Sequence, residues 1–330
     1  MTRRVIMSFI GRKSLFTGCV IALVAFFGVQ KQAVSDGHAF TIGATVWDVS
    51  STPFAVPLVK AMREAAEAAG VNLIISDPKW DASVQTENVR EFVVQGVDAI
   101  GIAPIDVAGI MPAVQEAWAA GIPVVGALGE IEGAPYVGVD DVEYGRRSAK
   151  LMLQVIRESN IDGTARIVMF RGTAGGSPDR LRMQGMTEVF DSTGADIEWV
   201  HVTADWLPDK ALTGFQDVLQ RFPDKGSIHI VNSMGNCMVP PSLDWAKRMG
   251  RDEIQFVAID MCKAEEEAVG RGDMYGTVFQ DPYIMGALLI NSLVAMNAAG
   301  DFETLPIFAE NPPMDYCTTA NYASCKGRGF

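Results

Sequence analysis

The chain has 330 residues, of which 48% are apolar and 20% charged, and its formal net charge is −13 at neutral pH. This length and composition exclude a disordered or fibrous chain and leave room for two domains with sizeable cores. The acidic excess disfavours nucleic acid and anionic membrane surfaces as partners, because a negative surface repels phosphate groups.

The first 35 residues are basic and apolar. They carry five basic side chains and no acidic one, and residues 15–29 are almost free of polar side chains. This pattern, with the small residues Ala33 and Ser35 before a cleavage point, predicts a signal peptide over residues 1–35 and export to the periplasm. Two alternatives stay open: lipidation of Cys19, and a retained membrane anchor, for which the apolar run is shorter than the ~20 residues that a spanning helix needs.

Cleavage would leave 22 basic and 40 acidic residues, a net charge of −18. No later segment is expected to span a membrane. Four cysteines would remain in an oxidising compartment, where an even number favours disulfide bonds. Of the three possible pairings we favour Cys317 with Cys325 and Cys237 with Cys262.

The mature region begins with alternating β-rich and helical segments. The helical segments carry apolar side chains at three- and four-residue spacing and end in glycine, as helix C-caps require. The repeated order of strand and helix predicts a parallel sheet with right-handed crossovers. Strands are expected at residues 40–47, 71–77, 97–104, 122–128 and 136–140, and helices at 53–70, 83–96 and 107–121.

A second series with the same alternation follows. The sequence therefore predicts an α/β fold of two similar, doubly wound parallel-sheet domains of the Rossmann-like kind. The apolar helix expected at residues 282–300 has no obvious partner in the second half, and we expect it to return to the first. The strands of the second half are expected at residues 165–172, 197–204, 227–234, 254–261 and 274–281, with helices such as 177–194 and 207–222.

The returning helix implies that the domains exchange chain segments through a multi-strand hinge. Ligands of open parallel sheets bind beyond the carboxyl ends of the strands, and clefts between domains are favoured sites for small molecules. We expect an N-terminal α/β domain from residues 36–139 plus 281–305, a C-terminal α/β domain from residues 140–280 plus 306–330, a ligand cleft between them, and hinge segments at 139–141, 280–282 and near Leu305.

The expected strand ends carry aromatic rings and hydrogen-bonding side chains. Rings that cover C–H groups, with Asp and Arg that bind hydroxyls, favour a neutral, hydroxyl-rich ligand. Each residue alone also has a structural explanation, such as core packing for a tryptophan or helix capping for an aspartate, and only their convergence on one cleft favours binding. The candidates are Trp47, Asp48, Thr52 and Phe54 in the first half, and Arg180, Arg182, Trp206, Asn232, Ser233, Asp260 and Gln280 in the second.

Signatures of enzymes and cofactors are weak. The histidines at positions 38, 201 and 229 lack metal-ligand spacing. The glycine-rich residues 172–179 lack the Lys-Ser/Thr ending of a phosphate-binding loop, and no dinucleotide fingerprint follows the first strand. We therefore expect no enzymatic activity, no cofactor and no metal site, and a loop at 172–179 that lets the backbone approach a ligand closely.

Six segments of the mature chain have the order and approximate spacing of a known family. They are residues 51–73, 85–104 and 113–125, followed by "RLRMQGM", "VAIDM" and "GTVFQDPYIMG". Over residues 40–310 the chain resembles the periplasmic sugar-binding proteins of ABC transporters, of the ribose-binding-protein type and the type I periplasmic binding protein fold. The resemblance implies ligand contacts for Asp48, Phe54, Arg182 of the R-x-x-G motif, Trp206, Asp260 and the hinge-side Gln280.

The chain also departs from ribose binders. Their Asp-Arg pair after the fourth strand is replaced by Leu128, Gly129 and Glu130, and an Asn-Asp pair by Ser233 and Met234. These changes favour another sugar, a polyol or a smaller and more apolar solute. The resemblance implies a monomer that captures its ligand by hinge closure and delivers it to the membrane permease of an ABC transporter. Alternatives are a periplasmic ligand-sensing partner of a membrane sensor kinase and, less favoured, an enzyme on this fold.

Overall fold

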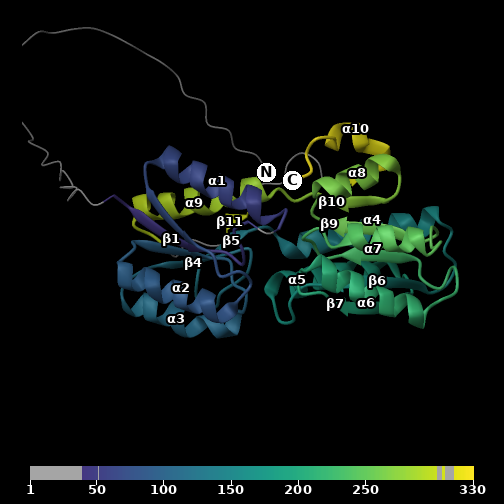
Figure 1. The fold of residues 1–330 in the computed structure, drawn as a ribbon, viewed down its shortest axis with the longest axis horizontal. Helices are drawn as coiled ribbons and strands as arrows, with labels where there is room; N and C mark the ends of the chain where they lie inside the picture. The colour runs from purple at the N-terminus through teal and green to yellow at the C-terminus, as the bar shows by residue number, and fades with distance from the viewer. Residues whose placement is uncertain (1–38, 51, 303–306, 309–315) are drawn as a thin grey trace, which may run out of the picture. The chain divides into compact units, whose positions relative to one another are not determined.

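The computed structural model describes residues 39–50, 52–302, 307–308 and 316–330. The expected signal peptide at residues 1–35, Cys19 and the hinge candidate Leu305 lie outside these residues. The described residues form two six-stranded sheets, each covered by helices on both faces (Figure 1). The α/β fold with two doubly wound sheets that the sequence predicts is therefore confirmed.

The first sheet is parallel throughout and has the strand order β11-β5-β4-β3-β1-β2. Helices α2 and α3 pack together on one face, and α1 and α9 on the other (Figure 1). Strands covered on both faces read as continuous apolar runs, and β3 and β4 are buried at every position. The elements are β1 (Thr41–Thr45), α1 (Ala55–Ala69), β2 (Asn72–Ser76), α2 (Ala82–Gln95), β3 (Ala99–Ile102), α3 (Val107–Ala119), β4 (Val124–Ala127), β5 (Tyr136–Gly138), α9 (Pro282–Ala299) and β11 (Ile307–Phe308).

The second sheet has the order β12-β10-β9-β8-β6-β7, with β12 antiparallel to β10. Helices α4 and α5 pack together against one face, and α6 and α7 against the other. The elements are α4 (Asp141–Glu158), β6 (Ala165–Arg171), α5 (Ser177–Thr193), β7 (Ile197–Thr203), α6 (Pro208–Arg221), β8 (Ile230–Ser233), α7 (Val239–Arg248), β9 (Gln255–Ile259), α8 (Lys263–Arg271), β10 (Gly276–Val278), β12 (Tyr316–Thr318), a 3-10 turn (Thr319–Asn321) and α10 (Tyr322–Cys325).

Helix α9 follows the second sheet in the chain but packs on α1 and the first sheet, as expected. With 18 residues and a mean hydropathy of 1.4 it has the length and composition of a short membrane span, contrary to the expectation that no later segment does. Its buried side chains, such as Leu289 and Leu293, show that it serves here as a core helix. Strand β11 pairs with β5 of the first sheet. Residues 307–308 therefore belong to the first sheet and not to the C-terminal domain, in which residues 306–330 were expected.

Two disulfide bonds join the described cysteines in the pairings that the sequence favoured. Cys237–Cys262 links the loops after β8 and β9, and Cys317–Cys325 closes a loop within residues 316–330. The same segment is held by the Glu266 carboxylate, which accepts the main-chain N–H groups of residues 327 and 329 at 2.6 Å.

Residue Phe330, at the other end of this segment, connects the two halves. Its main chain bonds to Met261 and Lys263 beside β9, and its ring meets the edge of Phe54, with centroids 5.4 Å apart. Phe54 directly precedes α1 of the first sheet.

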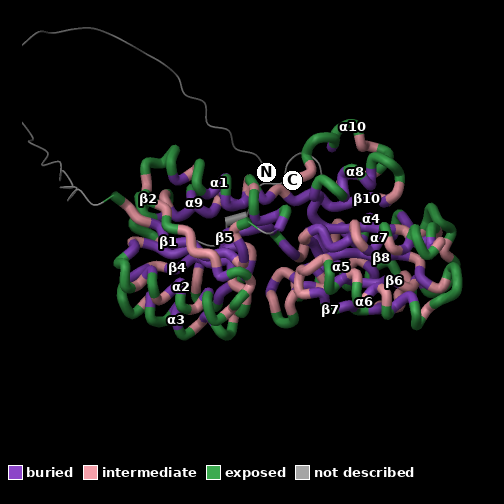
Figure 2. The backbone as a smooth tube through the Cα atoms, in the orientation of Figure 1, coloured by how far each residue is buried: buried purple, intermediate pink, exposed green. Residues whose placement is uncertain are grey.

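Buried residues run through both sheets and the helix faces that contact them (Figure 2). In the second half α4 and α5 approach closely at two glycines. A Cβ on Gly185 would overlap the Val142 carbonyl oxygen, and one on Gly145 would overlap that of Arg182. The glycine three residues after Arg182 therefore lets α5 lie directly against the start of α4.

We predict that Gly185→Ala lowers the free energy of unfolding by about 2 kcal/mol, because the new methyl group has to push two packed helices apart. Urea unfolding followed by circular dichroism measures the change. The neighbouring Gln184 is exposed and provides the control, since Gln184→Ala should leave stability within about 0.5 kcal/mol of the parent. Equal stability of both variants would contradict the close packing of α4 on α5.

Candidate functional site

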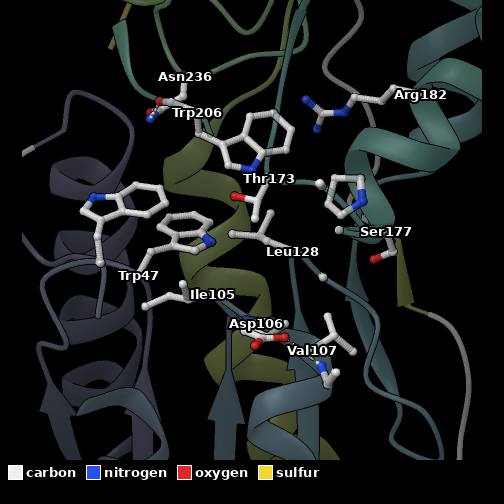
Figure 3. A pocket seen from close by; sticks show the side chains of 18 of the residues that line it. Trp47, Ile105, Asp106, Val107, Leu128, Thr173, Ser177, Arg182, Trp206 and Asn236 are labelled. Carbon is white, nitrogen blue, oxygen red and sulfur yellow. Dashed lines mark hydrogen bonds between the residues drawn. The ribbon is translucent and has the colours of Figure 1, made fainter. Parts of the chain in front are cut away.

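A cavity of about 700 Å³ opens at the carboxyl ends of the strands of both sheets. The first half lines it with residues that follow β1, β2, β3 and β4, and the second half with residues that follow β6 to β10. Figure 3 shows side chains from both halves, among them Trp47, Ile105, Thr173 and Trp206, pointing into the same space. This is where the topology of open parallel sheets favours a ligand.

Six of the side chains singled out in the sequence line this cavity. They come from both halves and from elements far apart in the chain. Their contact with a ligand stays a prediction. The six are Trp47, Phe54, Arg182, Trp206, Asp260 and Gln280.

Two candidates of the first half serve their own loop and are not among the cavity-lining residues. Asp48 is buried, and its Oδ1 accepts the Ser50 N–H at 3.1 Å. The Thr52 hydroxyl accepts the Ala55 N–H at 3.2 Å, at the first residue of α1. Neither group is placed by the structure at the surface of the cavity.

Three candidates of the second half also lie away from the lining. Asn232 is fully buried in β8 and donates to the Ser148 hydroxyl at 3.0 Å, and Ser233 exchanges hydrogen bonds with the main chain of residue 235. Arg180 is exposed and pairs across the halves with Glu130 at 3.4 Å.

Arg182 is the most highly connected side chain at the site. Its Nε donates to Asp141 Oδ1 at 2.7 Å, its Nη1 to the Met234 carbonyl oxygen, and its Nη2 to Gln280 Oε1 at 3.0 Å. Asp141 begins α4 just after the first sheet, and Gln280 precedes α9, which returns to that sheet. One buried guanidinium therefore holds both of these chain crossings.

Asp260 has one satisfied and one unsatisfied oxygen. Its Oδ2 accepts the Asn236 N–H at 2.5 Å, whereas its buried Oδ1 has no hydrogen-bond partner among the described residues. Burial raises the pKa of this carboxyl to about 6, although the nearby Arg182 charge acts in the opposite direction. Burial raises the pKa of Asp141 in the same way.

Aromatic rings form much of the wall. Trp47 stacks on Trp80 with ring centroids 6.0 Å apart and planes 13° from parallel, and Phe54 meets Trp47 edge-on at 5.9 Å. Trp206 enters from the second half, where the Arg182 guanidinium lies 5.8 Å from its ring centroid. Within the described residues the buried Trp80 Nε1 also has no hydrogen-bond partner.

The backbone of the cavity loops is strained. A positive φ is uncommon for a residue other than glycine, costs on the order of 1–3 kcal/mol, and clusters at functional sites. The surrounding packing thus holds these loops in conformations that they would not adopt alone. The strained lining residues are Trp80 (φ 63°), Leu128 (55°), Trp206 (64°), Asn236 (55°) and Asp260 (79°).

Sequence reasoning missed Trp80 and Asn236. Both follow a strand, β2 and β8 respectively, so the rule that predicted Trp47 would also have found them. Trp80 lies four residues beyond its strand after "DPK", which is typical of a turn. The glycine-rich loop at 172–179 does line the cavity, largely with small residues, as a loop of close backbone approach should.

Comparison with known proteins identifies this architecture. The family model described as periplasmic binding protein domain matches residues 42–301. The ribose import binding protein of Bacillus subtilis is 30% identical over 254 residues, which cover 76% of this chain and 79% of that protein. The xylitol-binding protein of Mycolicibacterium smegmatis is 27% identical over 270 residues, covering 81% of this chain and 75% of that one.

A solved structure shows the same arrangement. An ABC transporter solute binding protein from Mycobacterium smegmatis with bound glycerol superposes with a TM-score of 0.78 at 26% identity. The match covers 88% of this chain and 98% of the other.

The raised pKa of Asp260 predicts how stability depends on pH in the ligand-free protein. As pH rises from about 4 to 6, the unfolded chain loses this proton before the folded protein does, so the Asp260 contribution to stability falls. The free energy of unfolding of Asp260→Asn, relative to that of the parent, should therefore rise by on the order of 2 kcal/mol between pH 4 and pH 6. Above pH 6 the difference should stay constant.

Urea unfolding at pH 4, 5, 6 and 7 measures the difference. The matched control is Asp252→Asn, at the other end of β9, where the side chain is exposed and folding does not bury the charge. A difference between parent and Asp260→Asn that stays flat from pH 4 to 7 would contradict the burial of an ionisable Asp260.

Proposed function

This chain belongs to the periplasmic binding protein family, and we propose that it captures a sugar or polyol in the cavity and delivers it to the permease of an ABC transporter. The family consists of solute-binding proteins and not of enzymes. Relatives named for ribose and xylitol and a structure with bound glycerol support a small hydroxylated ligand.

One observation carries the proposal: each half contributes a cavity-lining residue with a buried hydrogen-bonding atom that has no partner among the described residues. Asp260 Oδ1 of the second half is an acceptor without a partner, and Trp80 Nε1 of the first half is a donor without a partner, both among the described residues. A hydroxyl group both donates and accepts, so a molecule with several hydroxyls could satisfy the two atoms together. The outward face of the stacked Trp47–Trp80 pair would cover C–H groups of the ligand.

Contacts between the halves support capture by closure. The Glu130 N–H donates to the Ser177 hydroxyl at 2.7 Å, which joins the loop after β4 to the start of α5. A ligand that touches both halves stabilises the state in which they are closed, in proportion to the contacts that the open state lacks. The segments at 139–141 and 280–282, both held by Arg182, are the proposed hinge.

We further propose that the mature protein acts as a monomer in the periplasm after its signal peptide is removed. A transporter reconstituted in liposomes should then hydrolyse ATP faster when the liganded protein is added than when the ligand-free protein is added. A sensor kinase as the partner would leave that rate unchanged.

Binding should be visible as a shift in melting temperature. A ligand at a concentration 100 times its dissociation constant stabilises the folded state by about 2.7 kcal/mol, which raises the melting temperature by several degrees. We expect at least one compound in a panel of pentoses, hexoses, inositols and linear polyols to produce such a shift. Absence of any shift across the panel at millimolar concentrations would contradict the proposed ligand class.

Truncation of a wall residue should weaken that ligand. Trp206→Ala removes an aromatic face and is expected to raise the dissociation constant about tenfold or more in calorimetric titrations. Trp245→Ala is the matched control, because Trp245 lies on α7, is half-buried and does not line the cavity. Equal losses in the two variants would point to a general effect on folding and not to a ligand contact.

A further inference from the structure

The buried charges beside the cavity do not balance. Asp141, Arg182 and Asp260 are 4%, 5% and 3% exposed, so two carboxylates share one guanidinium away from water. When all three are ionised, the trio carries one net negative charge. An uncompensated buried charge is strongly unfavourable, and either a proton or a bound cation relieves it.

The groups packed around Asp260 do not supply the missing positive charge. Glu265 of α8 is fully buried, and burial followed by the Asp260 charge raises its pKa to about 8, which leaves it neutral at pH 7. Burial also raises the pKa of Tyr144 on α4, so this phenol is neutral too. Among the described residues that line the cavity there is no lysine and no histidine.

The charge of Arg182 already compensates buried carboxylates and cannot also compensate an anionic ligand. Three of its N–H groups are engaged by Asp141, the Met234 carbonyl and Gln280, and its charge is already exceeded by the two carboxylates. An anion would raise the net negative charge of the site from one to two. A neutral ligand would leave it unchanged, and a ligand with one positive charge would cancel it.

We propose that the ligand of this cavity is a hydroxylated molecule that carries one protonated amine, which donates to the unpartnered Oδ1 of Asp260. The inference rests on the proposed function and narrows its ligand class from neutral sugars and polyols to their amine-bearing counterparts. The ammonium group supplies both the donor that Oδ1 lacks and the charge that the buried trio lacks.

The remainder of the lining suits a cation. Trp47, Trp80, Trp206 and Phe54 contribute aromatic rings, and a ring face attracts a cation by about 0.5–2 kcal/mol. The exposed carboxylates of two further lining residues, Asp106 and Glu132, add negative potential near the entrance. A negative cleft on an acidic protein concentrates cations.

The test compares matched ligands at pH 7 by calorimetric titration of the full protein. Each series contains a neutral parent, the same molecule with one hydroxyl replaced by an amine, and the N-acetylated amine, which keeps the nitrogen but removes its charge. The series are D-glucose with D-glucosamine, D-galactose with D-galactosamine, and myo-inositol with an amino-deoxy-inositol. In at least one series we expect the amine to bind tenfold or more tightly than both neutral members.

Variants locate the effect. Asp260→Asn keeps the size of the side chain and suits a backbone with φ of 79°, since asparagine tolerates this region, and it should abolish the preference for the amine. Asp252→Asn removes one negative charge from the surface at the other end of β9 and should retain the preference. Should Asp260→Asn fail to fold, the parent protein provides the second measurement. Affinity for the amine should fall from pH 7 to pH 5 as Asp260 becomes protonated, while affinity for the neutral parent should not.

The outcomes separate the two proposals. If neutral parents bind as tightly as the amines, the amine inference is wrong and the proposed function stands. If no member of any series binds, the amine inference is wrong, and the proposed function is decided by the wider panel of pentoses, hexoses, inositols and linear polyols. If the preference for the amine survives in Asp260→Asn, or affinity for the amine does not fall at pH 5, Asp260 is not the group that binds it.

Discussion

The ion pair between Arg182 and Asp141 is the constraint on which the site depends. A guanidinium that is 5% exposed has to find partners within the protein, because leaving its N–H groups unpaired would cost several kcal/mol. Those partners are Asp141 and Gln280, at two crossings between the sheets, and a carbonyl in the loop after β8. Satisfying one buried charge therefore fixes both crossing segments and a cavity loop together. The glycine at 185 makes the arrangement sterically feasible, since a larger residue would hold α5 away from α4.

Much of the architecture follows from local patterns in the chain. Helices of period 3.6 that end in glycine, with β-rich runs between them, predict the two sheets. Four cysteines after the expected signal peptide favour the two disulfide pairings that the structure contains. Side-chain direction is harder to derive. Asp48 sits at a strand end like Asp260, but its carboxylate turns back to its own loop, and nothing in the local sequence distinguishes the two. The ion pair of Asp141 with Arg182 could not be predicted from the sequence either. An acidic residue at a helix start is usually explained by its interaction with the helix N-terminus, and Arg182 lies 41 positions away in the chain.

The strained loops and the unpaired buried atoms both cost stability, and both occur in the same cavity. A protein optimised for stability alone would place glycine at positive φ and would bury no carboxylate oxygen without a donor. Here Trp80, Trp206, Asn236 and Asp260 depart from those rules within one cavity. The disulfide between Cys237 and Cys262 lies within two residues of Asn236 and of Asp260 and ties their loops together. Cross-linking the loops that hold Asn236 and Asp260 preserves a preorganised wall that the local backbone preference would otherwise relax.

The edge-to-face contact between Phe54 and Phe330 joins the two halves at a residue that lines the cavity. Any movement that separates the halves at this point wets both rings, so the edge-to-face contact biases the ligand-free protein toward closure by about 1 kcal/mol. Phe330 is not one of the cavity-lining residues. If the halves close on a ligand as proposed, substitutions of Phe330 would change the affinity for every ligand without changing a side chain that lines the cavity. Affinity could then be changed by substitutions at Phe330, and selectivity by substitutions of the cavity-lining residues.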